Sequence, residues 1–301
     1  MRNTFCQTLV QYSDLPDFVF LTGDLGFMAL EPLQKSAGER FINAGIAEQN
    51  MVSVSAGLAK TGLKPWAFSI APFIYARPLE QIRNDVCLHD LPVKLVGNGG
   101  GYGYGVMGGS HHAIEDYGIL LSLQNMRVFV PAFAVDIPPI VEKLQNLPHP
   151  AYLRLGKDEK PKDLEIKLYA PWRKILEGDG PTLLITGPLA GNLWSNLKEL
   201  NKQKRPKTWV LTELPFDEKT IPNEFMKDLR ISDHLIIVEE HVAHGGVGEM
   251  MSRCLLLNGE APRQFNHYCA QGYLSGYYGS QNFHRKESGL TVENILKKLS
   301  N

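Results

Sequence analysis

The stretch EQNMVSVSAGLAKTGLKPWAFSI, residues 48–70, contains the pattern from which the fold can be inferred. Within residues 48–60, small and apolar side chains recur at helical spacing, namely Met51, Val52, Ser55, Ala56 and Ala59. The run WAFSI at 66–70 has the aromatic and β-branched content of a strand. A helix followed at once by a strand predicts a layer of helix packed on a layer of sheet.

The same pattern extends in both directions along the first half of the chain. Strands are predicted at FVFLT (18–22), VKLV (93–96) and VFV (128–130), and a second amphipathic helix is predicted over 134–147. This alternation of short strands with helices favours a parallel sheet that is covered by helices.

A charged segment separates this half from a second one. Nine of the seventeen residues from Lys157 to Arg173 are charged, which is typical of a solvated connector. Beyond it the alternation returns, with strands predicted at 182–186, 208–211, 235–238 and 264–268 and helices around 193–200 and 247–256. We therefore predict an α/β fold of two domains, residues 1–160 and 180–301, joined by a linker over 161–179. Each domain is expected to hold a mostly parallel sheet flanked by helices.

Composition and charge argue against several classes of protein. The 301 residues include 31 Lys and Arg against 32 Asp and Glu, so no basic surplus is present to bind nucleic acid. No apolar run approaches the ~20 residues of a membrane span, and Gln7, Gln11 and Asp14 interrupt the region where a signal peptide keeps its apolar core. We expect a cytoplasmic protein without a membrane partner. The four cysteines have no metal-binding or disulfide spacing, so no metal ligands are predicted on this chain.

The first candidate for chemistry is Glu48, which opens the helix predicted over 48–60. An exposed carboxylate at this position complements the helix dipole and contributes roughly 0.3–1 kcal/mol. The neighbouring side chains of Ile46, Ala47 and Met51 instead suggest a poorly hydrated setting, in which an acid holds its proton more readily and can act as donor as well as acceptor. The sequence leaves both interpretations open.

The second candidate is a glycine-rich loop with two histidines at its exit. Residues 97–109 contain eight glycines and follow a predicted strand, so the backbone there can approach a ligand closely or form a flexible loop tip. Because adjacent side chains point in different directions, His111 and His112 are expected to divide into one ligand-facing and one structural histidine. A further glycine pair, Gly245-Gly246, precedes the helix at 247–256 and is either a tight turn or an anion cradle.

Taken together, residues 46–51, 68–85 and 97–132 resemble the pyrimidine-binding domain of transketolases, and the second half resembles the C-terminal domain of that family. The resemblance implies that the chain binds thiamine diphosphate. Glu48 matches the family glutamate that bonds the N1′ nitrogen of the aminopyrimidine and thereby promotes formation of the nucleophilic carbanion of the thiazolium ring. His111 matches the histidine that hydrogen-bonds the donor sugar or its intermediate.

The resemblance also assigns supporting roles. Asp24 is expected among the cofactor-binding residues, and His112 and Arg154 among those that place the substrate, with Arg154 on its distal phosphate. Ala71 stands where the family has an aromatic ring stacked on the aminopyrimidine, so Phe73, Phe68 or Tyr75 is expected to supply that ring, with Phe73 the nearest replacement in the sequence.

Two further substrate positions depart from the family. Met107 stands where typical members carry an aspartate that reads a donor hydroxyl, and Gly99 stands where some members carry a phosphate-binding histidine. A less hydroxylated or non-phosphorylated donor, such as pyruvate, is therefore a hypothesis.

One half of the cofactor site is missing from the sequence. The family binds Mg²⁺ and the diphosphate through a GDG motif that follows a strand and an asparagine further along the chain. Here Gly178-Asp179-Gly180 precedes a predicted strand, and the asparagines after it come too early, so this segment is predicted to be a turn. The Mg²⁺ ligands are then expected on an N-terminal partner subunit, with two copies of each chain in a heterotetramer.

These observations favour the C-terminal subunit of a split transketolase, which transfers a two-carbon ketol unit between sugars or sugar phosphates. A relative of 1-deoxyxylulose-5-phosphate synthase and the beta subunit of a 2-oxo acid dehydrogenase share the layout and remain alternatives. The segment His111–Asp116 together with Asn125–Val128 favours transketolase over the dehydrogenase subunit. A catalytically inactive paralogue that binds a partner is a further alternative, although the presence of Glu48 argues for chemistry.

Overall fold

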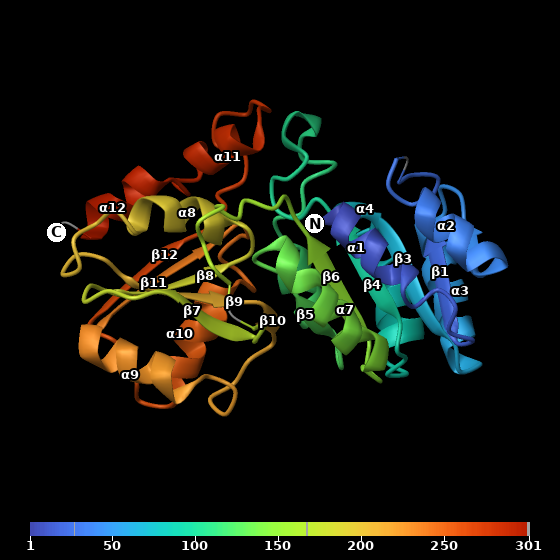
Figure 1. The fold of residues 1–301 in the computed structure, drawn as a ribbon, viewed down its shortest axis with the longest axis horizontal. Coiled ribbons are helices and arrows are strands. Elements are labelled where there is room, and N and C mark those ends of the chain that lie inside the picture. Colours follow the sequence, from blue (N-terminus) through green and yellow to red (C-terminus); the bar gives the residue numbers. More distant parts are fainter. Residues whose placement is uncertain (27, 167, 300–301) are drawn as a thin grey trace.

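The computed structural model describes residues 1–26, 28–166 and 168–299, and it contains two sheets that lie side by side (Figure 1). The first domain runs through α1 (Arg2–Val10), β1 (Phe18–Thr22), α2 (Glu31–Ala37), β2 (Phe41–Asn43), α3 (Glu48–Lys60), β3 (Lys64–Ile70), α4 (Ala71–Tyr75), α5 (Leu79–Gln81), β4 (Lys94–Asn98), α6 (Asp116–Leu121), β5 (Arg127–Phe129), α7 (Ile137–Asn146) and β6 (Ala151–Leu155). Short helical turns lie at Gly38–Arg40, Ile82–Cys87, Gly105–Met107 and Ala134–Asp136.

The first sheet has the order β10-β5-β6-β4-β3-β1-β2. Its strands β1 to β6 pair in parallel, and β10 (Glu213–Leu214), which comes from the second half of the chain, pairs antiparallel with β5. The four strands predicted in this half are confirmed, with boundaries that shift by at most two residues. Strand β10, which follows β9 of the second sheet in sequence, thus connects the second domain to the first sheet.

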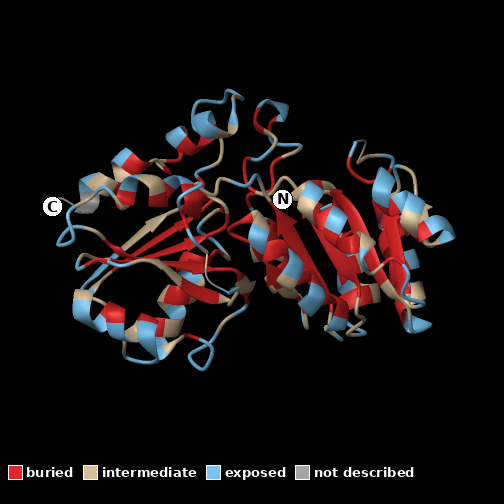
Figure 2. Ribbon diagram, viewed as in Figure 1, coloured by how far each residue is buried: buried red, intermediate tan, exposed pale blue. Residues whose placement is uncertain are grey.

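Both faces of the first sheet are covered, because alternate strand residues point in opposite directions. Phe18 and Phe20 of β1 face α1, α2 and α7, whereas Val19 and Leu21 face the side on which α3 and α4 lie. Figure 2 shows the central strands buried, and the exposed residues lie mainly on the outer surfaces of the helices and in the loops. The helix predicted over 48–60 is confirmed, and its predicted apolar face is the buried one.

The second domain runs through β7 (Trp172–Leu176), β8 (Thr182–Thr186), α8 (Leu189–Leu197), β9 (Lys207–Leu211), α9 (Asn223–Ser232), β11 (His234–Glu239), α10 (Val247–Leu257), β12 (Gln264–Tyr268), α11 (Gln281–Glu287) and α12 (Val292–Leu299). Its sheet has the order β12-β11-β8-β9-β7, parallel except for β7. The predicted fold class, two mostly parallel sheets flanked by helices, is confirmed.

The segment predicted as a linker contains regular structure. Strand β7 lies inside residues 161–179 and pairs with β9. Its Trp172 ring packs on Phe225 at 5.2 Å, and the guanidinium of Arg173 is buried against the Asp136 carboxylate at 2.8 Å. The charge content of the segment did not predict this strand, because the charge of Arg173 is paired with Asp136 inside the protein. The described residues of the chain include no helix that is both long enough and apolar enough to span a membrane.

The segment Gly178-Asp179-Gly180 forms the predicted turn. The backbone N–H groups of Asp179 and Gly180 donate to the carbonyl oxygens of Lys202 and Arg205 at 2.8 and 2.9 Å. A Cβ atom at Gly178 would collide with the Arg205 carbonyl, so the close approach of two backbone segments requires glycine here.

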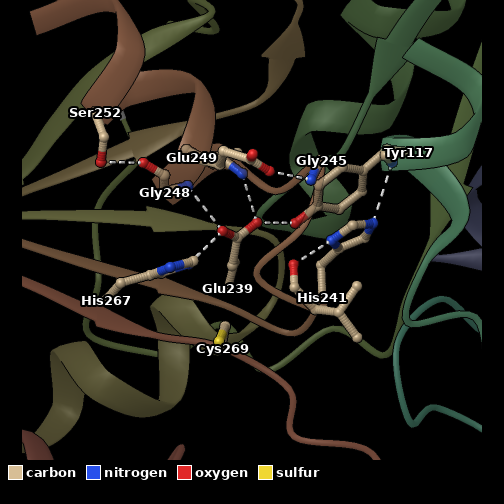
Figure 3. A network of polar contacts seen from close by, with 12 residues as sticks. Tyr117, Glu239, His241, Gly245, Gly248, Glu249, Ser252, His267 and Cys269 are labelled. Atoms are coloured by element: carbon tan, nitrogen blue, oxygen red, sulfur yellow. Dashed lines mark hydrogen bonds and ion pairs between the residues drawn. The ribbon is translucent and has the colours of Figure 1, made fainter. Parts of the chain in front are cut away.

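The two domains meet around the buried carboxylate of Glu239, at the end of β11 (Figure 3). The carboxylate accepts hydrogen bonds from the N–H groups of Val247 and Gly248 at 2.8 and 2.9 Å, from His267 Nε2 at 2.7 Å, and from the Tyr117 hydroxyl of the first domain. The helix N-terminus after Gly245-Gly246 is therefore occupied by a carboxylate of the chain itself. That contact explains the glycine pair without an external anion.

Tyr117 also stacks on His241 with ring centroids 3.7 Å apart, which extends the contact between domains. Burial alone raises the pKa of Glu239, but the hydrogen bonds from His267, Gly248 and Tyr117 outweigh it, and the pKa is lowered. A carboxyl group with a lowered pKa in the folded state contributes stability at neutral pH, and that contribution is lost as the pH falls through the folded-state pKa.

We therefore expect Glu239→Gln to lower the free energy of unfolding at pH 7 by about 2–3 kcal/mol, because it removes the charge from a buried, fully bonded site. The deficit relative to the wild type should shrink as the pH is lowered toward 3. Urea unfolding across this range measures it. Glu218→Gln, at an exposed carboxylate in the segment before α9, is the control and should change stability by less than about 0.5 kcal/mol. A deficit that does not depend on pH would contradict this account.

Candidate functional site

The candidate site lies where the parallel strands of the first sheet end. The segments after β1, β2, β3 and β4 carry Asp24, Glu48, Phe73 and the glycine-rich loop. The carboxyl ends of parallel strands share one edge of the sheet, and ligands of open α/β sheets bind at that edge. The topology thus brings together residues that the sequence separates by up to about ninety positions.

Glu48 is the first residue of α3, and only 6% of its surface is exposed. Both carboxylate oxygens accept from Nη1 of Arg77, at 3.0 and 3.1 Å. A cavity of about 550 Å³ opens beside the carboxylate and is lined by residues 46–50 and Arg77. The burial of Glu48 contradicts its interpretation as a solvated partner of the helix dipole.

The aromatic ring nearest to Glu48 is that of Phe73. Arg77 lies over this half-buried ring, with its guanidinium carbon 3.7 Å from the ring centroid. Tyr75 is in a different position: its ring is buried in the core, and its hydroxyl donates to Glu115 at 3.3 Å. A cofactor ring cannot stack on Tyr75 in this conformation, so the expectation for that residue is corrected in favour of Phe73.

His111 also contacts Phe73. Its ring meets the Phe73 ring edge-on at 5.2 Å and lies 5.8 Å from the ring of Tyr104, and Nδ1 is 2.9 Å from the Ser110 hydroxyl. The contacts of Arg77 and Phe73 therefore link Glu48 to His111, the two residues predicted to be catalytic. The hydrogen bonds found for the His111 ring involve Nδ1 alone, which leaves Nε2 for a ligand.

His112 is buried, and both of its ring nitrogens have hydrogen-bond partners within the protein. Its Nε2 lies 2.8 Å from the carbonyl oxygen of Gly105 and must carry the proton, so Nδ1 accepts from the Tyr273 hydroxyl at 3.0 Å. Burial lowers the pKa of His112 and favours this neutral form. Of the predicted pair of one ligand-facing and one structural histidine, His112 is therefore the structural one. The further expectation that His112 contacts the substrate disagrees with this structure, because both of its ring nitrogens have partners in the protein.

Arg154 is also held inside the protein. Nε donates to the Asp116 carboxylate at 2.8 Å, and Nη2 donates to the carbonyl oxygens of Ala113 and Glu240 at 2.6 and 2.9 Å. The side chain lies directly under Gly100, where a Cβ atom would collide with it. Arg154 therefore stabilises the glycine-rich loop and the contact between the domains. The prediction that it contacts a substrate phosphate disagrees with this conformation.

The remaining predicted residues lie around the rim. Gly99 has φ +80°, and a Cβ there would collide with the Tyr104 ring, so backbone geometry already requires glycine. Met107 is exposed in the short turn Gly105–Met107, at the tip of the loop. Asp24 is exposed and accepts from the Asn43 amide at 3.4 Å. All three stand at the mouth of the same sheet edge.

Sequence reasoning missed Arg77. A signal was present, because Phe73 and Arg77 are four residues apart in a segment that begins as a helix, which places their side chains on one face. It also missed Tyr273, whose contact with His112 comes from the other domain.

A cavity of about 800 Å³ elsewhere, lined by Lys160, Lys162, Tyr169 and Arg173 among others, contains none of the predicted site residues. Across residues 1–26, 28–166 and 168–299, no group of three or more His, Cys, Asp or Glu side chains is placed to hold a metal ion.

The fold and the site define a two-domain α/β protein with a buried acid at the edge of its first sheet. Residues 3–162 match the family described as "Transketolase, pyrimidine binding domain". The match spans more than half of the chain, and the chain belongs to the transketolase family. The predicted resemblance to the C-terminal subunit of a split transketolase is confirmed.

Individual relatives agree with this assignment. The chain is 30% identical over 267 residues to a subunit of the apulose-4-phosphate transketolase of Phocaeicola vulgatus, covering 85% of this chain and 84% of that protein. It is 28% identical over 306 residues to a 6-deoxy-6-sulfo-D-fructose transketolase subunit of a Clostridium species, covering 99% and 92%. Among solved structures, a split-gene transketolase described as an inactive β4 tetramer has 28% identity and a TM-score of 0.82, covering 99% and 96%.

The two histidines should separate in their effect on stability. We expect His112→Ala to lower the free energy of unfolding by about 2–4 kcal/mol, because the Tyr273 hydroxyl and the Gly105 carbonyl lose their partner and a cavity remains. His111→Ala should stay within about 0.5 kcal/mol of the wild type, since its ring is partly in solvent. Urea unfolding of both variants measures the difference. Equal losses would mean that His111 is also structural.

Proposed function

We propose that this chain is the C-terminal subunit of a two-chain, thiamine-diphosphate-dependent transketolase-like enzyme. The enzyme transfers a two-carbon ketol unit between sugars or sugar phosphates. The observation that carries the proposal is the buried Glu48 carboxylate at the carboxyl edge of the sheet. It opens onto a cavity whose lining includes Arg77, and Arg77 in turn contacts the Phe73 ring.

The residues present fit the aminopyrimidine of the cofactor. A flat heterocycle with ring nitrogens needs a hydrogen-bonding group in its plane and an apolar surface against its face, and Glu48 and Phe73 supply these from adjacent elements. When bound, thiamine diphosphate supplies a nucleophilic carbon that makes cleavage beside a ketone feasible. Among the described residues that line this cavity the one cationic side chain is Arg77, which is already paired with Glu48.

The chain's own residues then act as follows. Glu48, shielded from water, shares a proton with the ring nitrogen and so controls the protonation state of the heterocycle. Phe73 orients the ring by stacking. Nε2 of His111, whose ring contacts Phe73, hydrogen-bonds an oxygen of the donor near the bond that breaks.

The diphosphate and Mg²⁺ belong, in this proposal, to an N-terminal partner subunit. The turn at 178–180 lacks the arrangement of the family's metal-binding motif, and no metal-binding group was found in the described part of the chain. The Phocaeicola relative is itself described as one subunit of its enzyme, which supports a second chain here. Two copies of each chain would complete two sites.

The donor is the least constrained part of the proposal. The two curated relatives are described with different sugars, and here the exposed Met107 and the conformationally required Gly99 occupy positions that read the donor in typical family members. An apolar side chain at this position favours a donor with fewer hydroxyl groups, which makes a 2-oxo acid the second candidate. Rates with matched ketose and 2-oxo acid donors decide between them.

Glu48→Gln tests the function directly. In the complex with the partner subunit, we expect turnover to fall about 10²–10⁴-fold, because the amide cannot take up and return the proton. Steady-state kinetics with saturating thiamine diphosphate measures the loss. Glu80→Gln, at an exposed carboxylate in α5, is the matched control and should leave turnover unchanged. Unchanged turnover in Glu48→Gln would reject the activating role.

If the cofactor site is divided between this chain and a partner subunit, a second prediction concerns cofactor affinity. The isolated chain should bind thiamine diphosphate weakly and with little dependence on Mg²⁺, whereas the complex should bind tightly and lose the cofactor when EDTA removes the metal. Isothermal titration calorimetry of both preparations makes the comparison. Tight, Mg²⁺-dependent binding by the isolated chain would contradict the partner arrangement.

A further inference from the structure

Arg77 is the residue of this site to which the proposed function gives no role. A single nitrogen, Nη1, donates to both oxygens of Glu48, and the guanidinium lies flat over Phe73 with its carbon 3.7 Å from the ring centroid. The same guanidinium lines the cavity beside the carboxylate.

An aminopyrimidine in this site would need the same two residues, with the hydrogen bond to Glu48 reversed, because its ring nitrogen accepts a proton where the guanidinium donates one. A guanidinium is a planar, delocalised group that offers N–H donors at its edge and a flat face for stacking. In this structure the edge is used on Glu48 and the face on Phe73. A ring that stacked on Phe73 and bonded to Glu48 would have to occupy the same volume.

We propose, resting on the proposed function, that Arg77 is an internal occupant of the pyrimidine site, and that the cofactor ring binds by displacing it. The pair satisfies a buried carboxylate that would otherwise lack a partner. Arg77 thus keeps the site folded and closed until the ligand replaces it, at which point Glu48 takes up from water the proton that it then shares with the ring nitrogen.

The position of Arg77 allows it to leave. Its side chain is 45% exposed, whereas that of Glu48 is 6% exposed, so the cation can turn into water while the carboxylate stays in place. The residue lies between the end of α4 at Tyr75 and the start of α5 at Leu79, where no helix fixes its direction. The displacement therefore needs a change of rotamer and no change of fold.

Displacement has a cost that can be measured. When only a fraction of the molecules has an open site, the apparent affinity for a ligand falls by that fraction. Removing the guanidinium should then tighten binding of the pyrimidine, although it removes a side chain from the site. A residue that contacted the ligand favourably would give the opposite sign.

The probe is an uncharged aminopyrimidine without the diphosphate, 4-amino-5-hydroxymethyl-2-methylpyrimidine, so that no phosphate can pair with Arg77. With the full-length chain, we expect Arg77→Met to bind it about tenfold more tightly than the wild type in calorimetric titration. Arg83→Met, at an exposed arginine that bonds Asn84 nearby, is the matched control and should bind like the wild type.

A second measurement varies the salt concentration. Raising NaCl from 0.05 to 0.5 M should tighten binding of the pyrimidine by the wild type, because salt screens the Arg77–Glu48 pair, and should leave the affinity of Arg77→Met unchanged.

A measurement on the wild type avoids any loss of folding in the variant. The Nε–Hε signal of Arg77 in a ¹⁵N NMR spectrum should move toward that of a solvated arginine as the pyrimidine is added, while the Arg83 signal stays in place. Weaker or equal binding by Arg77→Met, or an unmoved Arg77 signal at saturation, would overturn the inference. So would the absence of binding by every chain. The turnover of Glu48→Gln in the complex tests the function separately, so the two failures can be told apart.

Discussion

The site depends on one constraint: a carboxylate that is almost fully removed from water must have a partner. Glu48 begins α3 at the edge of the sheet, and in this structure Arg77 satisfies it while resting on Phe73. The constraint explains why a half-exposed arginine is drawn into the site. Under the proposal for Arg77, a ring that stacks on Phe73 takes its place only if Glu48 also takes up the proton that it shares with the ring nitrogen.

The same rule governs the boundary between the domains. Glu239, at the end of β11, is bonded by the N-terminus of α10, by His267 and by Tyr117 of the other domain. Arg154 joins the Asp116 carboxylate to the carbonyl oxygens of Ala113 and Glu240. Charged groups that could have been ligand contacts instead hold the two sheets together, which places the C-terminal domain directly beneath the glycine-rich loop.

That loop is shaped from both sides. Tyr273 reaches it through His112, and the ring of Tyr278 lies where a Cβ of Gly108 would go, so its glycines accommodate side chains of the second domain as well as a ligand. The C-terminal domain thereby influences where His111 lies without contacting the reacting atoms. A change in the second domain can alter the site through this loop.

The sequence alone determined the two-domain α/β fold, the start of α3 at Glu48 and the resemblance that assigned its chemistry, because helical and strand periodicities and short motifs are local properties of the chain. The tertiary structure decided which of two adjacent histidines is buried, that Arg154 points inward, that Tyr75 belongs to the core, and that a strand lies in the charged linker. These features depend on partners far away in sequence. Tyr273 is 161 residues from His112, and the Glu240 carbonyl is 86 residues from Arg154. No local pattern records such a partner, and burial, which sets whether a polar group binds a ligand or the protein, exists only after the chain has folded.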